Sequence, residues 1–175
     1  MASALLALLS DCVAILNRLE MGEFSVRQIM WKASIYFNGT EIAWADTMTR
    51  QYYSPAFKIP ITIPDPPDTT AKNNILNSLL SCAIAIKVFG DEWREVHFIL
   101  VSNAVREWAI APKNPAEDPF VISLQPLVLW NGSEPSHVKL IIYPYPNEEP
   151  KIVKFTPSEL PDIAEIRRII ALTRL

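Results

Sequence analysis

The chain has 175 residues, of which 50% are hydrophobic and 20% are charged, and its formal net charge is −3 at pH 7. This length is sufficient for one domain with a sizeable core, and the composition excludes an intrinsically disordered protein. The slight excess of acidic residues also excludes a protein whose whole surface binds a polyanion such as nucleic acid.

The first predicted element is a helix from Ala2 to Glu20, where Ala and Leu are frequent and neither Gly nor Pro occurs. Its apolar residues cover more than one face, which indicates burial against the rest of the domain, a second subunit or a membrane surface. The stretch is too short to span a bilayer and lacks the basic start of a secretory signal. We therefore divide the chain into an N-terminal apolar helix, residues 1–20, and a single β-rich α+β domain, residues 21–175.

A β-hairpin is predicted next, with strands over Gln28–Phe37 and Glu41–Thr49. Asn38-Gly39 separates them, and Asn-Gly is a preferred pair for a two-residue hairpin turn. The alternating segment Phe57–Pro64 contains two prolines, which cannot donate a hydrogen bond to a neighbouring strand. We expect this segment to be an edge strand of a sheet or a pseudo-strand that crosses the surface.

The middle of the chain predicts a short helix followed by a central hairpin. Thr69 or Thr70 can cap a helix that runs to about Ser81. Two apolar runs rich in β-branched residues follow, Cys82–Phe89 and Trp93–Val101, with a Gly-Asp turn between them. Because both runs are apolar at nearly every position, we expect two strands covered on both faces inside the domain.

The last third of the chain predicts further strands and a final helix. The expected elements are a strand within Ser102–Ala111, a second Asn-Gly hairpin over Phe120–Trp130 and His137–Tyr145, a short strand over Lys151–Phe155, a loose turn after Thr156, and a helix from Pro161 to about Thr173. Together the elements predict an α+β fold, in which antiparallel hairpins form a sheet or sandwich core with N-terminal, mid-chain and C-terminal helices.

The sequence carries no catalytic motif, and we expect no enzymatic activity, metal site or cofactor. His97 and His137 lie in no metal-ligand pattern, and there is no glycine-rich phosphate loop or nucleophile elbow. His97 sits in a predicted apolar strand and is expected in the core or an interface, whereas His137 is expected to be exposed. Cys12 and Cys82 lie in apolar surroundings and predict buried free thiols.

Two groups of residues are candidates for contacts with other molecules. Apolar side chains of the first helix are candidates for self-association or membrane contact: Leu5, Leu6, Leu9, Val13 and Leu16. C-terminal arginines and two tyrosines are candidates for a partner protein: Arg167, Arg168, Arg174, Tyr143 and Tyr145. The arginines are interleaved with acidic residues, which favours a mixed surface. Aromatic residues in strands can stack on bases, but few cations accompany them, and no sequence-specific nucleic-acid binding is expected.

The order of these elements resembles that of the small matrix proteins of plant rhabdoviruses, of the cytorhabdovirus type. The resemblance rests on the hairpin strands Met30–Phe37 and Glu41–Thr49, the mid-chain helix and a terminal helix over Asp162–Leu175, and it covers most of the chain in outline. It implies a structural protein that self-associates into a layer, condenses the nucleocapsid and contacts the membrane. Its expected location is the host cytoplasm and the virion.

Animal relatives of that family carry a basic N-terminus and a Pro-Pro-x-Tyr motif. Here the N-terminus is neutral, and Pro66-Pro67-Asp68-Thr69 lacks the tyrosine. Membrane contact is therefore expected through Leu5, Leu6 and Leu9 rather than through charge. The alternative is a cytoplasmic β-barrel or sandwich that binds a small apolar ligand or a partner protein.

Overall fold

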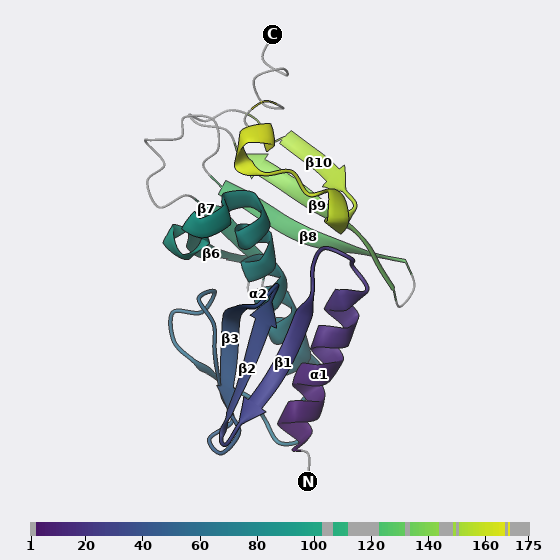
Figure 1. Ribbon diagram of the computed structural model, residues 1–175. Helices are drawn as coiled ribbons and strands as arrows, with labels where there is room; N and C mark the ends of the chain where they lie inside the picture. The colour runs from purple at the N-terminus through teal and green to yellow at the C-terminus, as the bar shows by residue number, and fades with distance from the viewer. Residues whose placement is uncertain are drawn as a thin grey trace.

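A computed structural model describes residues 3–102, 107–111, 123–131, 134–143, 149, 151–166 and 168. Within these ranges the chain forms two antiparallel sheets of five strands each. Helices pack against the first sheet, and the mid-chain helix leads from it to the second (Figure 1). The predicted α+β class is confirmed.

The first half of the chain contains one helix and the strands of the first sheet. Its elements are α1 (Ala4–Asn17), β1 (Phe24–Ile29), β2 (Lys32–Phe37), β3 (Thr40–Asp46), β4 (Gln51–Tyr53) and β5 (Ile61–Thr62). Each strand pairs with the next in the chain, so the sheet is a simple meander. Asn38 and Gly39 have φ angles of 49° and 82°, as expected for an Asn-Gly turn of the type predicted between β2 and β3.

Strand β1 is the main element that sequence reasoning missed in this half. The predicted strand from Gln28 to Phe37 is wrong at its start, because the chain turns at Met30 and Trp31 and separates β1 from β2. The β5 segment pairs with β4 at the sheet edge, so the edge position predicted for Phe57–Pro64 is confirmed over two residues.

One face of the first sheet is covered by helices. Side chains that alternate along β2, Ala33, Ile35 and Phe37, are fully buried in a core that also contains residues of α1 and of the mid-chain helix. The hydroxyl of Ser3 begins α1 by accepting a hydrogen bond from the Leu6 N–H at 3.0 Å. This arrangement makes α1 an integral part of that core.

The mid-chain helix α2 (Thr69–Phe89) is longer than predicted, and the predicted strand Cys82–Phe89 is wrong. Its N-cap is Asp68 rather than a threonine, and the Asp68 carboxylate accepts from the Ala71 N–H at 2.8 Å. Residues 82–85 are fully buried, so this part of the helix is apolar on all sides. Periodicity cannot distinguish such a helix from a buried strand.

Helix α2 ends at Gly90, where a short 3₁₀ helix, η1 (Gly90–Glu95), begins and leads into the second sheet. The strands of that sheet are β6 (His97–Ser102), β7 (Glu107–Ala111), β8 (Ser123–Asn131), β9 (Glu134–Tyr143) and β10 (Lys151–Phe155), again paired in chain order. The second predicted hairpin and the strands within 102–111 and 151–155 are therefore confirmed. The predicted strand from Trp93 begins only at His97.

After β10 the chain forms the 3₁₀ helix η3 (Pro157–Glu159) and then a helical turn that includes residues 163–166. This order agrees with the predicted loose turn followed by a helix. The predicted continuation of that helix to Thr173 lies largely outside the described residues. In Figure 1 the first sheet and α1 lie in the lower half of the view, near the N-terminus. Helix α2 runs from there to the second sheet in the upper half.

Candidate functional site

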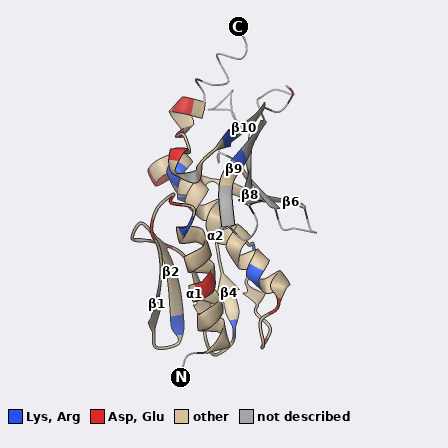
Figure 2. Ribbon diagram, turned by 90° about the vertical axis from the view of Figure 1, so that its right-hand side faces the viewer, with Lys and Arg blue, Asp and Glu red and all other residues tan. Residues whose placement is uncertain are grey.

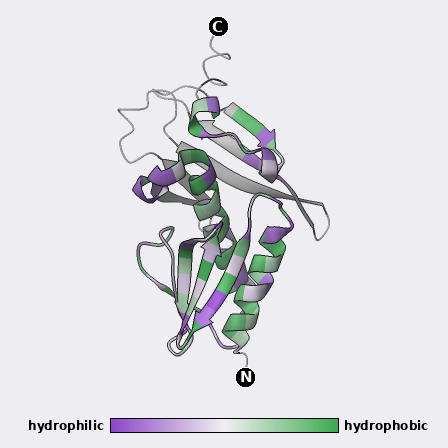
Figure 3. Cartoon of the chain, viewed as in Figure 1, coloured by the Kyte–Doolittle hydropathy of each residue, from purple (hydrophilic) through white to green (hydrophobic). Residues whose placement is uncertain are grey.

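The apolar residues of α1 lie inside the molecule rather than on a contact surface. Leu5, Leu9, Val13 and Leu16 are buried, and Leu6 is partly buried against the same core. The helix is hydrophobic along most of its length (Figure 3) because it packs beside β1 and α2. In this conformation the four buried side chains are not available to a second subunit or a membrane, and Leu6 is only partly exposed.

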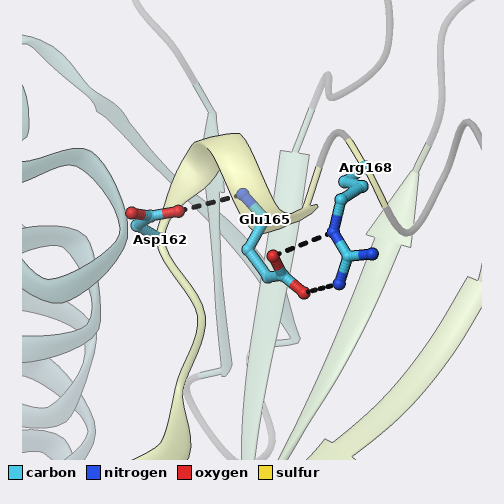
Figure 4. A network of polar contacts seen from close by, with 3 residues as sticks. All are labelled: Asp162, Glu165 and Arg168. Carbon is cyan, nitrogen blue, oxygen red and sulfur yellow. Dashed lines mark hydrogen bonds and ion pairs between the residues drawn. The ribbon is translucent and has the colours of Figure 1, made fainter.

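The predicted partner-contact residues are only partly described. Arg168 is exposed, and its guanidinium donates two hydrogen bonds to the Glu165 carboxylate, one of them at 3.1 Å (Figure 4). These bonds lower the pKa of Glu165, while Asp162 accepts from the Glu165 N–H at 2.9 Å. Arg168 is thus engaged in a local ion pair of a kind that adds little stability at an exposed surface.

The other members of that group lie outside the described residues or are described only in their backbone. Arg167, Arg174 and Tyr145 lie outside, and Tyr143 is the last residue of β9. Over the described part of the chain, basic and acidic residues are interspersed (Figure 2). The mixed surface predicted around the C-terminal arginines lies largely outside the described residues.

The face of the first sheet opposite the helices carries an aromatic stack. Trp44 of β3 lies directly across from Tyr53 of β4, with ring centroids 3.9 Å apart and an interplanar angle of 12°. Trp31 contacts Trp44 edge-on at 6.1 Å. The Lys32 ammonium lies 5.0 Å from the Trp44 ring centroid and 3.3 Å from the Glu41 carboxylate. Such cross-strand aromatic and cation–π contacts stabilise the sheet and fix these rings.

A pocket of about 310 Å³ adjoins this stack. It lies where β3 and β4 meet the loop of residues 54–60 and η1, and its aromatic lining is Trp44, Tyr53, Phe57 and Trp93. The exposed cations Lys58 and Arg94 also line it. The Arg94 guanidinium carbon lies 4.8 Å from the Trp93 ring centroid. No sequence pattern predicts this pocket, because its walls come from separate segments.

Exposed apolar side chains gather at one end of the first sheet, and we call them the apolar end: Ile29, Met30, Trp31 and Met48. Their exposed fractions are 58%, 82%, 44% and 78%. The turns that carry them are joined, because the Trp31 carbonyl accepts from both the N–H and the hydroxyl of Thr47, at 2.8 and 3.0 Å. Isolated exposed apolar residues are ordinary, but a group held together on two joined turns indicates a contact surface.

The two cysteines lie in surroundings that suppress their reactivity. Cys12 and Cys82 are free and buried, as predicted, and burial raises the pKa of each thiol to about 12. Thiols of this kind are inert, because the thiolate is the nucleophile. His97 is exposed, so a core position is wrong and an interface position stays a prediction, and His137 is half-buried rather than exposed. In the described ranges no group of three His, Cys, Asp or Glu could hold a metal ion.

Among the described helices, one segment, Thr69–Glu95, is long and apolar enough to cross a membrane by length and composition. However, 61% of its apolar window is buried within the molecule, which is the situation of a core helix. Comparison with known proteins finds no matching family model, curated protein or solved structure.

Proposed function

We propose that this protein is a structural protein that self-associates through the apolar end of its first sheet. The clustering of Ile29, Met30, Trp31 and Met48 on two joined turns supports this proposal. Covering these side chains with a second copy would remove their apolar surface from water, which is the main driving force of protein association. The turns are already held together, so little conformational freedom would be lost on binding.

The resemblance to plant rhabdovirus matrix proteins gives the proposal its more specific form. In that form the protein makes a layer between the nucleocapsid and the membrane, in the host cytoplasm and the virion. Because the leucines of α1 lie in the core and the apolar end serves self-association, the proposal assigns membrane contact to no described residue. The arginines Arg167, Arg168 and Arg174 remain the proposed contact for nucleocapsid protein.

Sedimentation velocity over a range of protein concentrations tests the proposed surface. The variant Met30→Ser/Met48→Ser makes the apolar end polar at two of its most exposed positions. The control Ile152→Ser changes an apolar residue that is 59% exposed on β10, in the other sheet. We expect the double variant to assemble about tenfold more weakly than the wild-type protein, and the control to assemble normally. Equal assembly of all three proteins would exclude the apolar end.

A second function, the binding of a small ligand, is favoured by one observation. The pocket beside the Trp44–Tyr53 stack has aromatic walls and a volume of about 310 Å³, near the lower limit of about 300 Å³ for ligand sites. This function is compatible with self-association, since the pocket is lined by Glu41–Trp44 of β3 and the apolar end lies at the turn that follows β3.

A further inference from the structure

We propose that the pocket beside the Trp44–Tyr53 stack binds a flat aromatic molecule that carries an anionic group. This inference goes beyond the proposed self-association and does not depend on it. The residues that line the pocket do not include Ile29, Met30, Trp31 or Met48. Trp31 contacts Trp44 of the pocket, so Met30 and Met48 are the positions at which the apolar end is changed without altering the pocket lining.

The size and walls of the pocket select a flat ring. A volume of about 310 Å³ suits one small ring system rather than an extended chain. The aromatic walls come from four separate elements: Trp44 from β3, Tyr53 from β4, Phe57 from the following loop and Trp93 from η1. Aromatic side chains favour other rings through offset or edge-to-face contacts.

These walls are fixed before any ligand arrives. Trp93 is only 5% exposed. Tyr53 is held by its stacking on Trp44 and by its hydroxyl, which donates to the Gln51 side-chain carbonyl at 2.9 Å. A pocket built from constrained side chains loses little conformational entropy on binding, which favours affinity.

The charges around the pocket select an anion. Lys58 and Arg94 are exposed cations, and Glu41 is the only acidic residue among the described residues that line the pocket. The Glu41 carboxylate is paired with the Lys32 ammonium at 3.3 Å, so its charge is balanced. The two remaining cations attract an anion and repel the organic cations that aromatic pockets otherwise bind.

Fluorescent probes test both parts of this inference on the full-length protein. Anilinonaphthalene sulfonate is an aromatic anion, and phenylnaphthylamine is its uncharged counterpart. We expect saturable sulfonate binding that weakens about tenfold in Lys58→Gln/Arg94→Gln, with a smaller change for the uncharged probe. The control Arg27→Gln removes an exposed cation from β1, away from the pocket, and should bind as the wild-type protein does.

Since the sulfonate can also bind to exposed apolar surfaces, the Met30→Ser/Met48→Ser variant is measured in parallel. It should retain sulfonate binding, and this result separates the pocket from the apolar end. Loss of binding in this variant, or equal sulfonate binding by Lys58→Gln/Arg94→Gln and the wild-type protein, would overturn the inference.

Two sources share the required chemistry, a nucleotide and a free aromatic acid. Competition with adenosine monophosphate and with indole carboxylate distinguishes them. Displacement of the sulfonate by the first identifies a nucleotide site, and displacement by the second alone identifies an aromatic acid site. Displacement by neither compound would contradict the proposed ligand class.

Discussion

The hydroxyl oxygens of Tyr52 and Ser78 lie 2.7 Å apart inside the core and join strand β4 to helix α2. Both residues are fully buried. Ser78 gives its own proton to the Ile75 carbonyl at 2.9 Å, so Tyr52 is the donor to Ser78. This polar contact fixes the position of α2 against the first sheet within a core that is otherwise largely apolar.

Removing the Tyr52 hydroxyl tests the energetic value of this contact. In Tyr52→Phe, Ser78 keeps its bond to Ile75, and we expect the free energy of unfolding to fall by about 1 kcal/mol. Ser78→Ala should also destabilise the protein, because it deprives a buried hydroxyl of a partner. Measured by urea denaturation, the double variant should lose less free energy of unfolding than the sum of the two single losses. Strict additivity would show that the two hydroxyl groups act independently.

Gly22 provides a steric test of the packing between the end of α1 and β2. A Cβ atom at this position would lie 2.5 Å from two ring carbons of Phe37, which is fully buried. We expect Gly22→Ala to lower the free energy of unfolding by about 1–3 kcal/mol, because Phe37 must shift within a packed core.

Gly39→Ala is the matched control for that substitution. Gly39 has a φ angle of +82° but no neighbouring atom within 4 Å of an added Cβ, so only backbone strain of about 1–2 kcal/mol is expected. If the loss is steric, the NMR resonances of the Phe37 side chain should change in Gly22→Ala and stay unchanged in Gly39→Ala. A Gly22→Ala protein as stable as the wild-type protein would contradict it.

Because burial raises the pKa of its two cysteine thiols, we expect the protein to lose stability at alkaline pH. Burial raises the pKa of Cys12 and Cys82 from an ordinary value of 9.0 to about 12, so the folded state holds both protons where the unfolded state releases them. The contribution of the two thiols to the free energy of unfolding is complete below pH 9. It is lost as the pH rises toward 12, at about 1.4 kcal/mol per pH unit for each thiol.

Denaturation curves measured between pH 8 and pH 11 check this slope. A Cys12→Ala/Cys82→Ala variant should lose stability less steeply over the same range, whatever its stability at neutral pH. A thiol reagent such as dithionitrobenzoate should also react with the native protein far more slowly than with the unfolded one. Rapid reaction of both thiols in the native state would contradict their burial.

The side chain of Asn17 joins the end of α1 to β1 of the first sheet through two hydrogen bonds. Its amide donates to the Phe24 carbonyl at 2.9 Å, and its carbonyl accepts from the Phe24 N–H at 2.7 Å. We expect Asn17→Ala to cost about 1–3 kcal/mol, because it leaves two backbone groups of β1 without these partners. Amide hydrogen exchange should become faster at Phe24, while an amide inside the β2–β3 hairpin such as Ile35 should be unaffected. Unchanged exchange at Phe24 would contradict the role of Asn17.

The hairpins could be predicted from the sequence because their signals are local. Asn38-Gly39 specifies a tight turn through the backbone conformations that Asn and Gly adopt easily, whereas in the second hairpin Asn131 still lies in β8, paired with Glu134. The length of α2 could not be predicted in the same way. Residues 82–85 are enclosed on all sides, and an enclosed helix and an enclosed strand are both apolar throughout.

The contact residues were harder to predict, because exposure depends on how distant segments pack. The leucines of α1 and the apolar residues at 29–31 are equally apolar in sequence, yet the former are mostly buried and the latter exposed. The pocket likewise brings Trp44 and Trp93 together from elements far apart in the chain. Only the tertiary arrangement separates core residues from surface residues here.

The most direct test of the central claim is the mass of the purified wild-type protein in solution as a function of its concentration, measured by light scattering at low and physiological salt. Growth into assemblies larger than a dimer is the result expected for a structural protein that self-associates through the apolar end. Since the contact is apolar, this growth should persist at physiological salt. A constant monomer mass at every concentration would contradict self-association.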